Sequence, residues 1–144
     1  MKVRRRQKGV GLVEVLIAVL VLSVGMLGMA VLQVRSLRNN QSAYQRSVAV
    51  MQVHAIADAM RSERNVAING GFDLGIDEDT PEDPATFPQV ALADWRAGLV
   101  ELLGPDASGS VACNGSLCTV TVVWNDERGS DGDAEMTLET QLQL

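Results

Sequence analysis

The fold of this chain is decided near its N-terminus by the run Gly9-Val-Gly-Leu-Val-Glu14-Val-Leu-Ile-Ala-Val-Leu-Val-Leu-Ser-Val-Gly-Met-Leu-Gly-Met-Ala-Val-Leu-Gln-Val34. Within residues 10–34 only Glu14, Ser23 and Gln33 are clearly polar. A helix rising about 1.5 Å per residue needs roughly 20 apolar residues to cross a bilayer core, so the run is long enough to span. The five basic residues before it predict a cytoplasmic N-terminus: Lys2, Arg4, Arg5, Arg6 and Lys8.

Glu14 is the residue that a simple membrane anchor would not need. A charged carboxyl at the centre of a membrane helix costs on the order of 2.5–3.5 kcal/mol on insertion scales, and less near the interface. An acid kept in such a place indicates a function, and its expected partner is a cation.

The spacing of Lys8-Gly9, Val10 and Glu14 resembles the class III signal of type IV prepilins. The resemblance implies that prepilin peptidase cuts between Gly9 and Val10, so that residues 1–9 are a leader peptide, and methylates the new N-terminus. Residues 21–33 look, more narrowly, like minor pilins of the PilV type. The likeness is close over roughly residues 7–65 and looser beyond, and Val10 departs from the Phe that is commonest in the family.

The resemblance implies a minor pilin that is built into a type IV pilus and contributes to its initiation or assembly, and so to motility or adhesion. Its partners would be prepilin peptidase, other minor and major pilin subunits and inner-membrane lipid. Val10 would present the methylated N-terminus, and Glu14 would meet the N-terminal amine of a subunit during assembly. The protein would cross the bacterial inner membrane once, with a periplasmic head, and would also be found in the cell-surface pilus.

Other interpretations of the N-terminus stay open. A pseudopilin of a type II secretion system shares the leader, the long helix and the head. A single-pass periplasmic sensor or adhesin would keep the segment as an uncleaved anchor. A cleaved secretory signal could use Gly28-Met29-Ala30 as its site, but its apolar core is typically 7–15 residues and would not contain Glu14.

The charge balance argues against nucleic-acid binding. Loss of residues 1–9 removes five of the twelve Lys and Arg residues and none of the eighteen acids, which leaves a side-chain charge of −11. Binding to phosphates depends on Lys and Arg, and the few aromatic residues offer no platform for stacking bases. We therefore expect no direct nucleic-acid binding.

Residues 35–65 are expected to continue the helix as an amphipathic half, which gives about 55 helical residues in all. Arg35 and Arg38 mark the exit from the membrane. Apolar residues recur at helical spacing in two rows: Tyr44, Val48, Met51 and Ala55 in one, and Val50, Val53, Ala57 and Met60 in the other. Such a stripe is suited to packing against a small sheet.

Residues 66–107 are expected to form a connecting loop that contains a short helix over 90–103. The helical row there is Leu92, Trp95, Leu99 and Leu102, with Trp95 as a core residue. Six acids and three prolines fall within residues 72–90, which is typical of a solvated loop. The EF-hand spacing is absent, so neither this loop nor Asp131, Asp133 and Glu135 is predicted to bind metal.

Residues 108–144 change to the two-residue period of β-strands, with strands expected over 110–113, 118–124 and 135–144. Asn114-Gly115 predicts a tight hairpin turn between the first two. Cys113 and Cys118 flank it, so a disulfide is expected if the head lies outside the cytoplasm, the alternatives being reduced thiols or a weak metal pair.

No readable arrangement of nucleophile, base or phosphate-binding glycines predicts catalysis, and no cofactor is expected. The predicted architecture is α+β and pilin-like: a long N-terminal helix, transmembrane in its first half and amphipathic in its second, with the second half packed against a small C-terminal antiparallel sheet.

Overall fold

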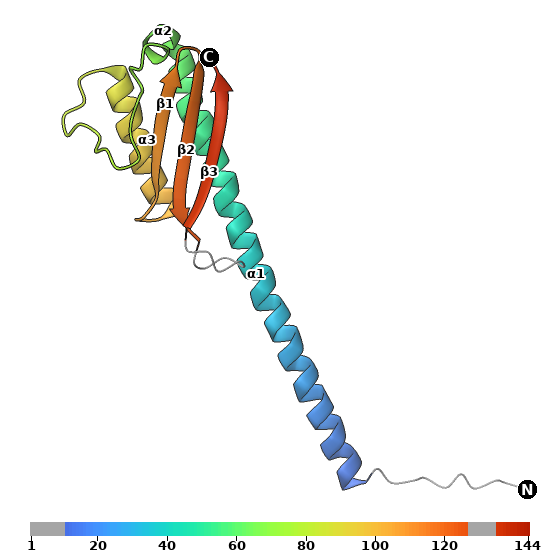
Figure 1. Ribbon diagram of the computed structural model, residues 1–144. Helices are drawn as coiled ribbons and strands as arrows, with labels where there is room; N and C mark the ends of the chain where they lie inside the picture. The colour runs from blue at the N-terminus through green and yellow to red at the C-terminus, as the bar shows by residue number, and fades with distance from the viewer. Residues whose placement is uncertain (1–10, 127–134) are drawn as a thin grey trace, which may run out of the picture. The chain divides into compact units, whose positions relative to one another are not determined.

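The computed structural model describes residues 11–126 and 135–144. Its elements, in chain order, are α1 (Leu12–Ser62), α2 (Arg64–Ala67), α3 (Phe87–Leu103), β1 (Ser108–Asn114), β2 (Leu117–Asn125) and β3 (Glu135–Gln143) (Figure 1). The predicted α+β architecture, a long N-terminal helix and a small C-terminal antiparallel sheet, is confirmed. The chain divides into two compact units, Met1–Leu37 and Arg38–Leu144, of which the second is hereafter the head.

The first unit contains the N-terminal part of α1, and its described residues, 11–37, form no core of their own. Its large apolar side chains are between 49% and 84% exposed from Leu12 to Leu37. Among the described residues, α1 is the one helix long and apolar enough to cross a membrane, with a stretch of mean hydropathy 2.8 of which none is buried. The hydroxyl of Ser23 donates to the carbonyl of Val19, so this polar side chain is satisfied within the helix.

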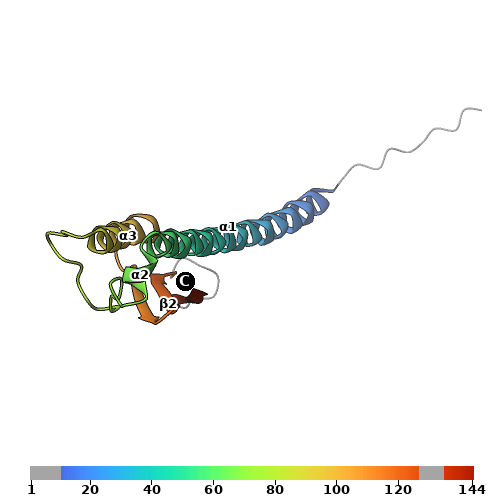
Figure 2. The ribbon, with the colours of Figure 1, turned by 90° about the horizontal axis from the view of Figure 1, so that it is seen from above.

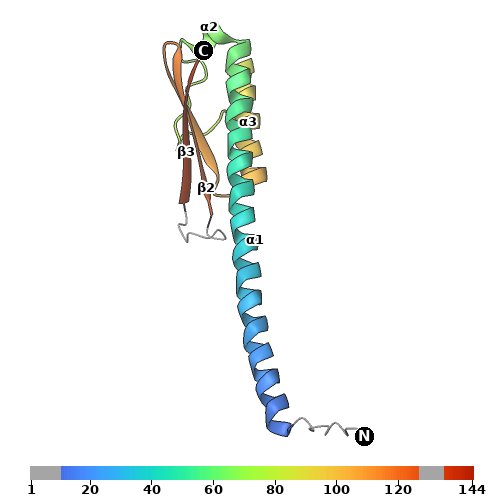
Figure 3. The same ribbon diagram turned by 90° about the vertical axis from the view of Figure 1, so that its right-hand side faces the viewer.

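The head consists of two layers, one helical and one a sheet. The C-terminal part of α1 and α3 run side by side, and the sheet lies along one side of them (Figures 2 and 3). The indole Nε1–H of Trp95 donates to the carbonyl of Gln52 at 3.0 Å, which joins α3 to α1. Gly98 of α3 also faces α1, and a Cβ there would lie in ordinary van der Waals contact with the Gln52 side chain, at 3.6 Å.

The sheet is an antiparallel meander in the order β1-β2-β3. Val120, Val122 and Trp124 of β2 are buried, and the residues between them face the other side. The side chains of β3 that share the core side of the sheet are only half-buried: Met136, Leu138, Thr140, Leu142 and Leu144. In β1, Gly109 is required by packing, since a Cβ there would lie 2.4 Å from the Trp95 ring.

The two predicted rows of the amphipathic half of α1 are covered to different extents: Val53, Ala57 and Met60 of the second row are buried, whereas Val48 is the one buried residue of the first. Tyr44, Met51 and Ala55 are exposed, and Val50 is 42% exposed. The side chains of α1 that enter the core are Val48, Ala49, Val53, Ile56, Ala57 and Met60. A single sheet covers one face of a helix, and helical spacing alone does not tell which of two neighbouring rows it covers.

The helix boundaries also differ from the prediction. α1 ends at Ser62, and a separate short helix, α2, follows after Glu63. α3 begins at Phe87 rather than at residue 90, because Pro88 is compatible with the first turn of a helix, where its missing N–H is not needed. The Gln89 Oε1 accepts from the backbone N–H of Thr86 at 3.2 Å, which satisfies a donor ahead of the helix. At the other end Leu103 is buried and Leu102 is exposed, which reverses the predicted assignment.

Candidate functional site

Glu14 lies in the first turn of α1, the third residue of the helix. Its backbone N–H donates to the carbonyl of Gly11 at 3.0 Å, and that of Val15 donates to the same carbonyl at 3.3 Å. The N–H groups of the first turn lack partners within the helix and give this end a partial positive charge, which favours a carboxylate there. An acidic side chain in this first turn is therefore placed favourably with respect to the helix dipole.

The side chains around Glu14 are apolar and exposed. Leu12, Val13, Leu16 and Ile17 are 84%, 68%, 67% and 58% exposed, and Glu14 itself is exposed. Among the described residues, none forms an ion pair with the Glu14 carboxylate. This carboxylate can accept hydrogen bonds or bind a cation supplied by another molecule, while the surrounding side chains supply a surface for lipid or for a second helix. Gly9 and Val10, where cleavage was predicted, lie outside the described residues.

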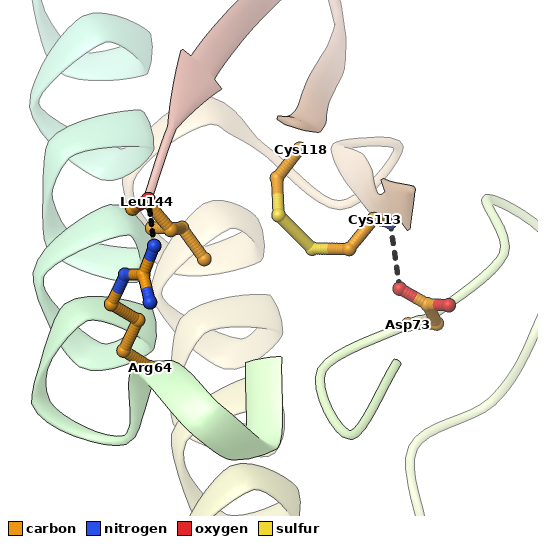
Figure 4. The surroundings of a disulfide bond; sticks show 5 residues. All are labelled: Arg64, Asp73, Cys113, Cys118 and Leu144. Atoms are coloured by element: carbon orange, nitrogen blue, oxygen red, sulfur yellow. Dashed lines mark hydrogen bonds between the residues drawn. A yellow bond between two sulfur atoms is a disulfide. The ribbon is translucent and has the colours of Figure 1, made fainter. Parts of the chain in front are cut away.

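The second group of predicted site residues is the pair of cysteines in the head. Cys113 and Cys118 form a disulfide, with an S–S distance of 2.03 Å and a Cα–Cα distance of 4.1 Å (Figure 4). They are directly opposite each other in the register of β1 and β2, and the described residues contain no free cysteine. The disulfide therefore joins β1 and β2 close to the turn of their hairpin.

The turn of this hairpin is placed one residue later than the Asn114-Gly115 signal suggested. Asn114 still pairs with Leu117, so the two central turn residues are Gly115 and Ser116. Gly115 has φ +61°, and no described non-glycine residue has a positive φ. A two-residue turn with a positive φ at its first central position only is the type II′ hairpin turn, which calls for Gly at that position.

Two polar contacts near the disulfide were not foreseen from the sequence. The carboxylate of Asp73 accepts a hydrogen bond from the backbone N–H of Cys113 at 2.8 Å, and Arg64 donates to the backbone oxygen of Leu144 at 2.8 Å (Figure 4). The Leu144 N–H in turn donates to Ser116 O at 2.8 Å. These contacts join residues 40 and 80 positions apart in the chain, so no local pattern could reveal them.

The acidic loop after α2 is held to α3 by Arg96. The Arg96 guanidinium donates to the carbonyls of Gly75 and Ile76 at 2.6 and 3.2 Å. Burial lowers the pKa of Arg96, and the neighbouring carboxylates Asp79, Glu78 and Asp77 partly oppose this effect. Within the described ranges no three His, Cys, Asp or Glu side chains are grouped so that they could hold a metal ion. Asp131 and Asp133 lie outside those ranges.

Hollows on the described surface of the head do not bring together residues of a recognisable catalytic group. One of about 550 Å³ is lined by Ser108, Ser110 and Thr121 together with Asp77, Asp106 and Glu135. The Ser108 hydroxyl donates to the carbonyl of Ile76 at 2.9 Å and not to a base. His54 is exposed on α1 and makes no hydrogen bond within the part of the chain that the structure describes.

Comparison with known proteins identifies one feature. Residues 4–30 match the family model of the prokaryotic N-terminal methylation motif, which includes Gly9, Val10 and Glu14. The match is consistent with a type IV pilin-like prepilin, a class of structural proteins and not of enzymes. Together with the long apolar helix it fits a membrane-anchored pilus subunit that is processed by prepilin peptidase and assembles with other pilin subunits. No curated protein and no solved structure gives a match to the chain.

Proposed function

We propose that this chain is a minor pilin of the PilV type, cleaved between Gly9 and Val10 and built into a type IV pilus, where it helps to initiate or assemble the filament and so supports motility or adhesion. The observation that carries the proposal is the methylation motif over residues 4–30, which leads into an exposed apolar helix with Glu14 in its first turn. The uncut protein would cross the inner membrane once with its head in the periplasm.

Cleavage supplies the cation that Glu14 lacks. It creates an α-amino group at Val10, and such a group is largely protonated near neutral pH. In an apolar layer an unpaired amine and an unpaired carboxylate are each costly, so pairing them between two subunits offsets both costs. The pair would set the register of an incoming subunit, and Leu12, Val13, Leu16 and Ile17 would supply the packing around it.

Processing is tested by the intact mass of the membrane-purified protein. The expected mass lacks residues 1–9 and carries one added methyl group. Replacing Gly9 with Phe should leave the uncut precursor in the inner membrane. An uncut wild-type protein in a strain with active prepilin peptidase would refute the cleavage step.

Assembly is tested at Glu14. Glu14→Ala and Glu14→Gln should be made, inserted and cleaved normally, but little of either should be found in sheared pili, because neither side chain carries the charge. Gln33→Ala serves as the control, since it removes the other long polar side chain of the apolar run and should enter pili as the wild type does. Wild-type levels of both Glu14 variants in filaments would rule out this role.

The motif itself is shared with pseudopilins of type II secretion systems, so the filament must be identified separately. A deletion strain that loses pili and motility while secretion continues, with both restored by the wild-type gene, would support the minor pilin. Loss of secretion with normal pili would replace it with the pseudopilin.

A further inference from the structure

β3 is an edge strand whose outer side has no partner among the described residues. It pairs with β2 over nine residue pairs, from Leu117↔Gln143 to Asn125↔Glu135, and with no other described strand. In an antiparallel edge strand every second residue directs its N–H and C=O away from the neighbouring strand. The one further backbone bond near it is made by Leu144, just beyond the strand. Figure 1 shows β3 along the outer side of the sheet.

The opposite edge of the sheet, formed by β1, is partly paired with a loop. Leu74 forms a bridge to Val111 of β1, with backbone hydrogen bonds of 2.9 and 3.0 Å in the two directions. The carboxylate of Asp73 accepts from Cys113 N–H next to it. A loop of the chain therefore partly covers the β1 edge, whereas no described segment pairs with the β3 edge.

The apolar face of the sheet is also incomplete at β3. The inward side chains of β2, Val120, Val122 and Trp124, are at most 2% exposed. Met136 and Leu138 occupy the corresponding positions on β3, yet they are only half-buried and pack at the margin of the core. A further strand beside β3 would cover this margin with its own inward side chains.

Two of the outward side chains of β3 are acidic, and this determines which charge a strand added beside β3 should carry. Glu135 and Glu139 are exposed and make no ion pair within the described part of the chain. β3 contains no Pro, no Gly and no inward-pointing charge, so these carboxylates are its only protection against pairing. A second copy of β3 added in antiparallel fashion would bring one row of glutamates beside the other, and like charges across a strand pair are destabilising.

We propose that β3 binds an extended segment of a different protein, which adds as a fourth strand of the sheet. Its inward residues would be apolar, to continue the row of Met136 and Leu138, and its outward residues would be Lys or Arg, to face Glu135 and Glu139. The surface lies wholly within the head, so the proposal does not depend on assignment of the chain to a pilus.

The test uses the full-length ¹⁵N-labelled protein in an uncharged detergent and two capped nine-residue peptides. One peptide alternates Lys and Val, and the other alternates Glu and Val. The Lys–Val peptide should shift the amide resonances of β3 and slow hydrogen exchange about tenfold or more at alternate β3 amides. A Lys–Val peptide with a central Pro should bind more weakly, because Pro removes a donor from the new ladder.

Two variants separate strand addition from general attraction to an acidic protein. The double variant Glu135→Lys/Glu139→Lys should bind the Lys–Val peptide about tenfold or more weakly and should now prefer the Glu–Val peptide. The matched control is Asp94→Lys/Glu101→Lys, which makes the same charge change on exposed positions of α3 and should keep the wild-type preference.

Three outcomes would overturn the proposal. The first is an absence of any effect on β3 amides at millimolar peptide. The second is an equal loss of affinity in the α3 control. The third is self-association of the wild-type protein that protects the β3 amides, since this would make a second copy the partner.

Discussion

α1 belongs to both units of the molecule, and its two parts are stabilised in different ways. From Leu12 to Leu37 every large apolar side chain is at least 49% exposed. In the head the same helix places Val48, Ile56 and Met60 at 1% exposure or less against the sheet and α3. One helix therefore carries a part that needs lipid or neighbouring subunits for its apolar surface and a part whose apolar face is covered by its own chain.

The polar residues of the two regions differ in the same way. Glu14 has no cationic partner among the described residues. In the head, the buried hydroxyl of Ser42 donates to the buried carboxylate of Asp126 at 2.6 Å, across 84 residues of sequence. A buried carboxylate needs such donors. The head supplies a donor to Oδ2 of Asp126, although Oδ1 of the same carboxylate is buried without a partner among the described residues. The first unit supplies no donor or cation to Glu14 from its described residues, which leaves Glu14 available to a partner.

The largest expected effect is on solubility: removing residues 1–37 should abolish the need for detergent. The remaining chain, Arg38–Leu144, keeps every residue of the hydrophobic core and the disulfide. We expect it to stay monomeric in water without detergent and to unfold cooperatively, with the same thermal midpoint as the head of the full chain. Sedimentation and circular dichroism would check this. Aggregation of the truncated protein would show that the head depends on the first unit.

The next largest effect is expected from truncating a core side chain. Phe72 is fully buried, and its ring makes an edge contact with Phe87 at a centroid distance of 6.3 Å. Phe72→Ala should lower the free energy of unfolding of the head by about 3–5 kcal/mol. Leu20→Ala, at a position that is 65% exposed in the first unit, is the matched control and should leave that free energy unchanged in detergent. Chemical denaturation would give both values, and equal effects would contradict the division into two units.

Loss of the disulfide should have an intermediate effect. The loop closed by Cys113 and Cys118 is short, so the chain-entropy model gives about 2 kcal/mol. The variant Cys113→Ala/Cys118→Ala should lose roughly this amount, and reduced wild-type protein should behave similarly in denaturant unfolding. In the periplasm, alkylation without reductant should label neither cysteine. Full labelling of a natively folded head would contradict the presence of the bond in the cell.

The smallest effect concerns the contact between α1 and α3 in the head. Trp95→Phe removes the donor to the Gln52 carbonyl, a bond of 3.0 Å, while Trp124→Phe removes an indole N–H that is buried without a hydrogen-bond partner among the described residues. Both changes reduce a buried indole to a phenyl ring. Trp95→Phe should therefore cost about 1 kcal/mol more than Trp124→Phe in free energy of unfolding. An equal cost would show that the Trp95 bond contributes nothing.

Much of the fold could be predicted because its signals are local. The alternation of Val120, Val122 and Trp124 placed β2 correctly, since a strand turns every second side chain to the same face. The row of Leu92, Trp95 and Leu99 placed α3 in the same way, because these three side chains are buried. The start of α3 was missed because proline is read as loop chemistry, although the first helical turn tolerates it.

The residues of the candidate site also divide into those with a local sequence signal and those without one. Glu14 stood out because a lone acid in an apolar run violates the composition of a membrane segment. The roles of Asp73, Arg64 and Arg96 had no such signal. Each forms hydrogen bonds to backbone atoms of residues at least 20 positions away, and only the folded chain brings those atoms together.

The sequence by itself determined the class of the molecule: a long helix that is apolar at its start, an acid near that start, a methylation motif and a small head with two cysteines. These features depend on composition and on spacing along one helix or one strand. Tertiary structure alone decided which row of α1 is covered, which leaves Tyr44 and Met51 exposed, and which edge of the sheet is open. Burial of a helix row and pairing of a strand each require a second segment that packs against the first. The periodicity of a segment shows which of its own residues share a face, but not where the distant second segment packs.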